Sequence, residues 1–279
     1  MKIILARSAG FCFGVKRAVN MAFQAAESAG HICSLGPLIH SPQLVARLEG
    51  EGIRVVNSVE SMTDETVIIR SHGVTRDEEE CLRRKQLPIV DATCPFVKKA
   101  QEYAELLGRE GYSVVIVGEA EHPEVQGIVS YVQAPSVFVV ADVADVRALR
   151  VGKKVGLVAQ TTQAYENFHA IAQELIGRCK ELRIFNTICD ATAVRQNEAR
   201  EVAAVVDVML VIGGHNSANT NRLARICSDI QPKTYHIETA SEIDNGWLDG
   251  VKTVGLTAGA STPEWIISEV VEKLKELAK

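Results

Sequence analysis

The sequence feature that most constrains the fold is a segment that occurs three times at long intervals. Cys12 begins CFGVKRAV and Cys94 begins CPFVKKAQ, which share the pattern C-x-x-V-K-(R/K)-A. Cys189 begins CDATAVRQ, where the Val-Arg pair comes two residues later, so the third match is looser. Similarity at a long interval indicates repeated supersecondary units. We therefore expect three related units in this chain.

The residues that follow each cysteine keep a similar spacing. His40 and His122 each lie 28 residues after the cysteine of their segment, and His215 lies 26 residues after Cys189. Farther along, each segment has a second apolar run that ends in polar residues: VIIRSHG with His72, VGLVAQTTQ with Thr161 and VGLTAGAST with Ser261. Ordinary strand–helix alternation does not explain spacings of 28, 28 and 26, so the spacing supports a true repeat.

The apolar runs predict an α/β fold with parallel sheets. Runs such as TVIIRS, SVVIVG and DVMLVIGG are short and rich in β-branched residues, as buried parallel strands are, and amphipathic segments separate them. We expect three small α/β units, residues 13–93, 94–188 and 189–279, with the N-terminal strand 1–12 joining the third. Loops at the carboxyl ends of parallel strands form ligand sites, so a pseudo-threefold arrangement would bring three thiols and six polar loops to one centre.

Composition narrows the classes of function. The net charge is −5, and no dense basic surface is evident, so we expect no nucleic-acid partner. No apolar run reaches 18 residues, so we expect no membrane span, and the start MKIILARSAGFCFG is interpreted as a strand rather than a signal peptide. Seven cysteines without an export signal indicate a cytoplasmic protein with reduced or metal-bound thiols.

Three widely spaced cysteines favour an iron–sulfur cluster. The sequence has no C-x-x-C pair, which argues against a structural zinc site. Each of the three lies at or near a predicted helix start, where the helix dipole favours the thiolate. Clusters usually take four cysteines, so three would leave one iron open as a Lewis acid for a substrate oxygen. We interpret the other four as small core residues: Cys33, Cys81, Cys179 and Cys227.

Histidines and glycine- or serine-rich loops predict an anion site. His40, His72 and His122 follow strand ends, and GGHNSANTN and AGASTPE offer backbone N–H groups at helix starts. Imidazolium donors from three such loops favour a diphosphate over a single carboxylate. The stretch from Ser261 to Glu264 fits a capping box with proline in the first turn.

Glu124 lies two residues after His122. A carboxylate beside a phosphate site weakens anion binding, so its presence there indicates proton delivery. Helix capping after Pro123 is the alternative interpretation of Glu124.

Taken together, the motifs resemble those of the 4-hydroxy-3-methylbut-2-enyl diphosphate reductases. The matching segments are AGFCFGVKRAV, HGV, DATCP, EHPEV, QTTQ, CDAT followed by RQ, NSANTNRL and TAGASTP, and they cover essentially the whole chain. The family catalyses the last step of the methylerythritol phosphate route to isoprenoids. The resemblance implies reductive dehydroxylation of (E)-4-hydroxy-3-methylbut-2-enyl diphosphate to isopentenyl and dimethylallyl diphosphates, with two electrons and two protons.

The resemblance also implies roles for individual residues. Cys12, Cys94 and Cys189 would hold a central [4Fe-4S] cluster, which becomes [3Fe-4S] when the labile iron is lost. Glu124 would pass protons, and Thr161 would help to place substrate and water. The implied substrate pocket comprises His40, His72, His122, Thr161, Ser217, Ala218, Asn219 and Ser261. Ferredoxin or flavodoxin would donate the electrons.

Two positions, Ala218 and Ser41, depart from the family pattern. Many relatives have a second serine at Ala218, so a hydroxyl contact is lost there and only a backbone N–H remains. Ser41 stands where asparagine is common, which changes a helix cap. His215 keeps the repeat spacing but matches no motif of the family.

Two other functions remain open from the residues alone. An electron carrier or redox sensor would use the same cluster without a substrate, but the polar loops and Glu124 would then have no role. A metal-free phosphate-binding transferase would merely pack the three cysteines. Substrate-dependent reoxidation of a reduced cluster separates the first possibility from a reductase, and a colourless, iron-free protein would indicate the second.

Overall fold

The computed structural model describes residues 1–28 and 30–278. By contacts the chain forms two compact units. Compact unit 1 comprises residues 1–16, 39–46 and 190–279, and compact unit 2 comprises residues 17–38 and 47–189. The described chain contains three four-stranded sheets, and every pair of neighbouring strands is parallel.

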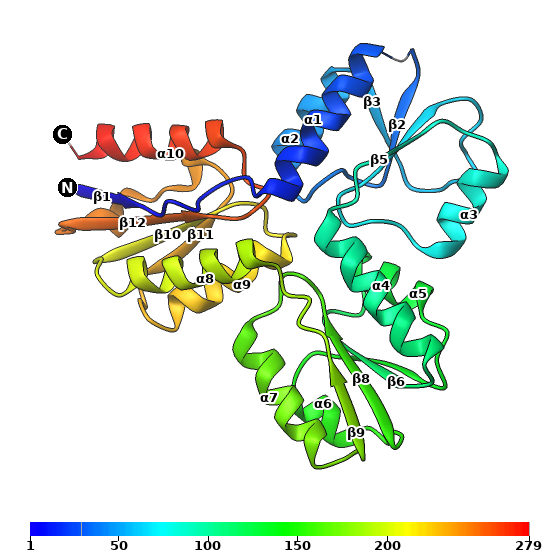
Figure 1. The fold of residues 1–279 in the computed structure, drawn as a ribbon. Coiled ribbons are helices and arrows are strands. Elements are labelled where there is room, and N and C mark those ends of the chain that lie inside the picture. Colours follow the sequence, from blue (N-terminus) through cyan, green and yellow to red (C-terminus); the bar gives the residue numbers. More distant parts are fainter. Residues whose placement is uncertain (29, 279) are drawn as a thin grey trace. The chain divides into compact units, whose positions relative to one another are not determined.

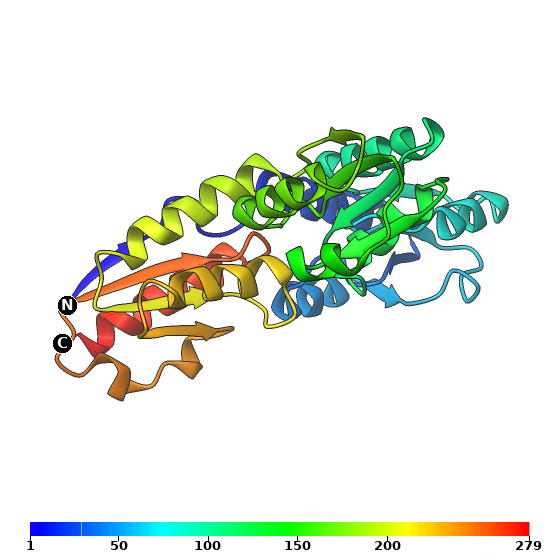
Figure 2. The same cartoon turned by 90° about the horizontal axis from the view of Figure 1, so that it is seen from below.

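Compact unit 1 contains one sheet with helices on both faces. Its strand order is β1 (Lys2–Leu5), β12 (Thr253–Ala258), β10 (Val208–Ile212), β11 (Thr234–Ile237). Helix α10 (Glu264–Leu277) packs on one face, and helices α8 (Asp190–Ala203) and α9 (Ala218–Ser228) pack on the other (Figures 1 and 2). Two 3₁₀ turns, Ala240–Glu242 and Asn245–Leu248, follow β11. The first strand of the chain therefore pairs with the last one.

Compact unit 2 contains the other two sheets. One has the order β3 (Ile53–Val56), β2 (Ile32–Leu35), β4 (Thr66–Ile69), β5 (Ile89–Asp91). The other has the order β7 (Val137–Val140), β6 (Ser113–Val117), β8 (Lys154–Ala159), β9 (Glu181–Ile184). The central strands β6 and β8 are buried on both faces, which explains their continuous apolar sequences.

Helices cover these two sheets. Helix α3 (Arg76–Arg84) packs Leu82 against the β2–β4 sheet. On the β6–β8 sheet, α4 (Pro95–Arg109) and α5 (Pro123–Tyr131) cover one face, and α6 (Val143–Ala148) and α7 (Tyr165–Ile176) cover the other (Figure 1). The remaining helices are α1 (Phe13–Ser28) and α2 (Pro42–Gly50). The predicted α/β class with parallel sheets is confirmed. The boundaries at residues 93 and 188 stay a prediction.

The predicted site residues lie at the carboxyl ends of strands, in the loops or in the first turns of the following helices. In the β2–β4 sheet, His72 follows β4 and Cys94 follows β5; in the β6–β8 sheet, His122 follows β6 and Thr161 follows β8. Cys189 follows β9, and in compact unit 1 Cys12, Ser217 and Ser261 follow β1, β10 and β12. All strands of a parallel sheet end at the same edge, so each sheet presents its site residues together.

None of the described helices is both long enough and apolar enough to cross a lipid bilayer.

Candidate active site

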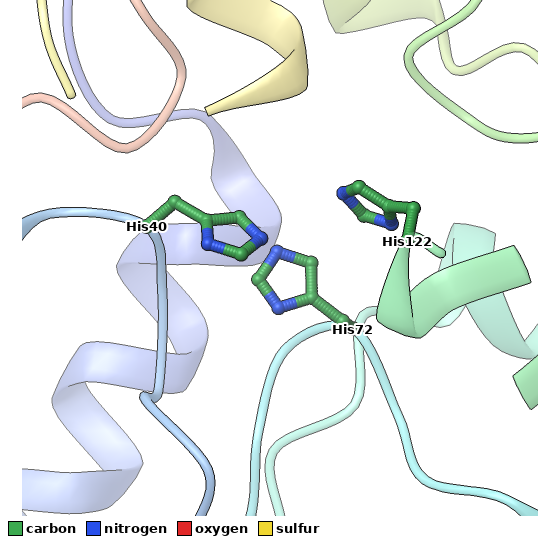
Figure 3. Close-up of side chains that lie close together, drawn as sticks. All are labelled: His40, His72 and His122. Atoms are coloured by element: carbon green, nitrogen blue, oxygen red, sulfur yellow. The ribbon is translucent and has the colours of Figure 1, made fainter. Parts of the chain in front are cut away.

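In compact unit 2, a continuous series of contacts connects the predicted site residues of two sheets. The N–H of Cys94 donates to the carbonyl of Ser71, 3.0 Å away, and Ser71 precedes His72. The rings of His72 and His122 meet edge to face, with centroids 5.5 Å apart, and ring nitrogens of the two lie within 4.8 Å (Figure 3). The loop after β4 and the loop after β6 therefore present their imidazoles to the same space.

His122 begins helix α5 and fixes its own ring by doing so. It is the N-cap residue, and its Nδ1 accepts the N–H of Glu124 at 3.1 Å. A ring nitrogen that accepts carries no proton, so His122 can donate only through Nε2. Sequence reasoning expects a ring that donates from both nitrogens, whereas here Nδ1 accepts and only Nε2 can donate.

Glu124 is the most perturbed carboxyl group of the candidate site. Its side chain is 2 % exposed, and its two carboxylate oxygens accept the N–H and the hydroxyl of Thr161 at 2.6 and 2.9 Å. Burial raises the pKa of Glu124 to about 7, and the two hydrogen bonds from Thr161 oppose part of that rise. A carboxyl group with this pKa exchanges protons near neutrality, as a general acid must.

Thr161 continues the series to the third cysteine segment. Its carbonyl accepts the N–H of Cys189 at 3.0 Å. Thr161 thus contacts the predicted proton donor with its hydroxyl and N–H, and a predicted cluster ligand with its carbonyl. In compact unit 2 the structure connects Cys94, His72, His122, Glu124, Thr161 and Cys189.

Compact unit 1 connects a second set of predicted residues. The N–H of Cys12 donates to the carbonyl of Ala260 at 3.2 Å, and the hydroxyl of the next residue, Ser261, donates to the carbonyl of His40 at 3.1 Å. His40, labelled in Figure 3, follows β2 in the sequence but belongs to compact unit 1. The loops that carry Cys12, His40 and Ser261 are therefore held together by one backbone hydrogen bond and one side chain-to-backbone hydrogen bond.

The loop after β10 begins helix α9 and carries the remaining predicted residues. Ser217 is the N-cap residue and accepts the N–H of Thr220 at 3.4 Å. Ala218 and Asn219 are the first two helical residues, and both are buried. Asn219 is 6 % exposed, and within residues 1–28 and 30–278 neither its Nδ2 nor its Oδ1 has a hydrogen-bond partner. Buried polar atoms without partners are costly, so Asn219 is suited to a ligand at this helix start.

Two residues that sequence reasoning missed hold this loop in place. His236 Nε2 lies 2.7 Å from the carbonyl of Gly213, and the Glu238 carboxylate accepts the N–H of His215 at 2.7 Å. Gly213 has φ +143, and a Cβ there would meet Thr262 Oγ1 at 2.5 Å. Burial lowers the pKa of His236, so near neutrality the ring is an uncharged donor to that carbonyl.

No local pattern marks His236 or Glu238, since they face the loop only because β11 pairs with β10.

One interpretation of the sequence is wrong. Helix α10 begins at Glu264 with Pro263 as its N-cap residue and no side-chain cap, so the capping box from Ser261 to Glu264 does not form. The reason is that the Ser261 hydroxyl bonds to His40 instead.

The four cysteines assigned to the core all lie in or against apolar core clusters, but they differ in burial. Cys33 and Cys227 are fully buried, and burial raises their pKa values to about 11 and about 12. Cys81 and Cys179 are only half-buried.

The comparisons with known proteins settle the family. A family model described as LytB protein matches residues 3–275. This chain belongs to the LytB protein family. Its LytB relatives include the 4-hydroxy-3-methylbut-2-enyl diphosphate reductase of Syntrophotalea carbinolica, 61% identical over 279 residues, with 100% of both chains covered. The reductase of Geobacter sulfurreducens is 59% identical over 276 residues, covering 99% of this chain and 98% of the relative.

Solved structures of two reductases are also similar to this chain. One, (E)-4-hydroxy-3-methyl-but-2-enyl diphosphate reductase, the terminal enzyme of the non-mevalonate pathway, is 47% identical with a TM-score of 0.73, covering 99% of this chain and 100% of the other. The E-1-hydroxy-2-methyl-but-2-enyl-4-diphosphate reductase of Plasmodium falciparum is 26% identical with a TM-score of 0.93, covering 100% of this chain and 88% of the other. The resemblance predicted from the motifs is confirmed.

Membership of the LytB family implies an iron–sulfur cofactor, and the donor set of the chain fits one. The three cysteines Cys12, Cys94 and Cys189 each directly precede a helix: α1, α4 and α8. Sγ of Cys12 accepts the N–H of Val15 at 3.5 Å, which places a helix-start donor on the sulfur. Such donors and the helix dipole stabilise thiolates, the form that binds iron.

Proposed function

We propose that this chain reduces (E)-4-hydroxy-3-methylbut-2-enyl diphosphate to isopentenyl and dimethylallyl diphosphates, removing the allylic hydroxyl as water with two electrons and two protons. Relatives that carry the name of this reductase match over the full length of the chain. The observation that carries the chemistry is Glu124, a buried carboxyl group with a pKa of about 7 that is hydrogen-bonded to Thr161.

Cys12, Cys94 and Cys189 would hold a [4Fe-4S] cluster by three thiolates, leaving one iron without a protein ligand. When bound, the cluster supplies single electrons and a Lewis-acidic iron. Ferredoxin or flavodoxin as the electron donor, and the cytoplasm as the location, are part of the same proposal.

The diphosphate is bound by two kinds of donor. The start of helix α9 offers backbone N–H groups of its first turn, the Ser217 hydroxyl and the buried amide of Asn219. The His40 ring adds a donor in the same compact unit, and Ser261 adds one when its hydroxyl turns from the His40 carbonyl to the substrate. At Ala218 only the backbone N–H is available. In compact unit 2, His72 and the Nε2–H of His122 donate to phosphate oxygens.

Glu124 delivers the proton. With a pKa of about 7, a substantial fraction of the group is protonated near neutrality, and the proton is transferred to the departing hydroxyl. Thr161 orients the carboxyl group through two hydrogen bonds. Burial of Glu124 keeps bulk water from exchanging that proton during the reaction.

The test is an anaerobic assay of the reconstituted full chain with a reduced dye, the allylic diphosphate, and iron and sulfide analysis. We expect iron-dependent formation of both isoprenoid diphosphates. Cys94→Ser should lose iron and activity, and Cys227→Ala, which changes a buried core thiol, should keep both. A chain that binds iron but does not reoxidise its reduced cluster with this substrate would be an electron carrier. A colourless, iron-free chain would contradict the reductase proposal altogether.

A further inference from the structure

The loop between β1 and α1 has to place the thiol of Cys12 although it contains no regular structure. It runs from Ala6 to Cys12, and Gly10 lies in the left-handed region with φ +96. A Cβ at Gly10 would lie 3.1 Å from Ile267, so the backbone also packs tightly against α10. Such a loop keeps one conformation only if its polar backbone groups are satisfied.

Arg195 on helix α8 binds the carbonyls of this loop. Its side chain donates to the carbonyl of Ser8 from Nη2 at 2.7 Å and from Nε at 3.1 Å, and to the carbonyl of Gly10 from Nη2 at 2.8 Å. Nη1 donates to the carbonyl of Ala191 at 3.2 Å, in the first turn of the same helix. Arg195 is only 3 % exposed, and a rigid planar group with several donors suits such multiple binding.

Glu198 on the same helix binds the amides of the same loop. Its two carboxylate oxygens accept the N–H groups of Arg7 at 2.8 Å and Ser8 at 2.7 Å. Burial acts to raise the pKa of Glu198, but the hydrogen bonds from Ser8 and Arg7 outweigh it and hold the pKa at about 2. The ion pair with the Arg7 side chain adds little, because that side chain is 93% exposed.

These two side chains are three residues apart and therefore share one face of α8. Arg195 supplies donors to the carbonyls of Ser8 and Gly10, and Glu198 supplies acceptors to the N–H groups of Arg7 and Ser8. One helix therefore satisfies backbone groups of both kinds in this loop. The same helix begins at Asp190, directly after Cys189. The loop that ends at Cys12 is thus fixed to the helix that Cys189 precedes.

We propose that Arg195 and Glu198 are positioning residues that hold the thiol of Cys12 in place as a cluster ligand. This inference rests on the proposed function, in which Cys12 is one of three ligands. Outer residues that orient metal ligands typically change metal retention by about 10-fold or more when they are removed. Without Arg195 or Glu198 the Cys12 segment becomes mobile, and iron leaves faster.

The experiment measures the rate at which the reconstituted full chain transfers iron to a chelator without oxygen. Arg195→Met removes the donors at similar volume, and Glu198→Ala removes the acceptor at a more exposed position, so that a folded variant remains for the test. Val202→Ala is the matched control: Val202 is buried on the same helix but packs in the core. Thermal unfolding of each metal-free chain measures general destabilisation.

We expect Arg195→Met and Glu198→Ala to release iron about 10-fold faster or more than the parent. Arg195→Lys keeps the charge and some donors, so its rate of iron release should lie between those of the parent and Arg195→Met. Val202→Ala should release iron at the parental rate despite its lower stability. Parental release from both Glu198→Ala and Arg195→Met would overturn the inference, as would equal acceleration by Val202→Ala.

A Cys12→Ser control separates this result from failure of the proposed function. It should lose iron. If it keeps as much iron as the parent, or if the parent itself binds none, the ligand assignment fails and the inference with it. If the parent holds iron and turns over while Cys12→Ser loses it, then parental iron release from the Arg195 and Glu198 variants refutes only the positioning role.

Discussion

Replacing Glu124 by glutamine tests the unusual acidity on which the mechanism depends. Gln keeps the shape of the side chain, and its amide oxygen can still accept the N–H of Thr161. Its NH₂ group can donate to the Thr161 hydroxyl oxygen, so the local hydrogen bonds survive. What is lost is the transferable proton. We expect turnover to fall by about 10²-fold or more while substrate binding and iron content stay near parental values.

The structure also predicts how the same change alters stability with pH. The pKa of Glu124 is raised from its ordinary 4.5 to about 7 in the folded chain. Between those pH values the unfolded chain loses a proton that the folded chain keeps. The contribution of Glu124 to the free energy of unfolding is therefore largest below pH 4.5 and is lost as the pH rises through 7. At about 1.36 kcal/mol for each pKa unit, the loss between pH 5 and pH 8 is about 2.5 kcal/mol. Glu124→Gln removes this loss.

The assay is urea unfolding of the metal-free chain and of Glu124→Gln at several values between pH 5 and pH 8, under reductant. The difference between the two free energies of unfolding should change with pH by about 2.5 kcal/mol, the variant gaining relative to the parent as pH rises. Curves that stay parallel would refute the assigned acidity. Parental turnover by the variant would refute the proton-transfer role, whatever the unfolding data show.

Two further predictions concern Thr161, which contacts Glu124, and His236, which contacts the loop after β10. The Thr161 hydroxyl lowers the pKa of Glu124, so in Thr161→Val the alkaline limb of kcat against pH should move to higher pH, and an unmoved limb would contradict the role of that bond. His236→Leu removes the group that contacts the carbonyl of Gly213, so KM for the diphosphate should rise about 10-fold, the value of one buried hydrogen bond, with kcat nearly unchanged. His236→Gln should restore part of the affinity, and a fall in kcat without a change in KM would contradict the positioning role.

The strands and site loops could be predicted from local sequence because burial and chain direction are local properties. SVVIV and VMLVI are continuous apolar runs, and they form β6 and β10, buried on both faces. Polar residues directly after such runs must lie at the carboxyl edge of a parallel sheet, which is why the sequence predicts Thr161 as a site residue. The connection of His72, His122 and Glu124 likewise follows from which strands the histidines follow.

The supporting residues could not be predicted because their partners are distant in sequence. Arg195 bonds to Ser8, 187 residues away, and nothing in the sequence around either residue indicates the pairing. Ser261 had a plausible partner three residues ahead, but its hydroxyl reaches the carbonyl of His40, 221 residues away. In both cases the hydrogen bond joins residues that are distant in the sequence, and no periodic pattern of the sequence indicates it.

Thr161 contacts Glu124 with its hydroxyl and amide and contacts the backbone of Cys189 with its carbonyl. One residue therefore joins the predicted proton donor to the backbone of a predicted cluster ligand. If Cys189 binds iron as proposed, a displacement of its segment on gaining or losing iron would move Thr161 and so change the acidity of Glu124. Under the proposed function, proton supply and electron supply would then be mechanically coupled, and a substitution in the turn after β8 would alter both.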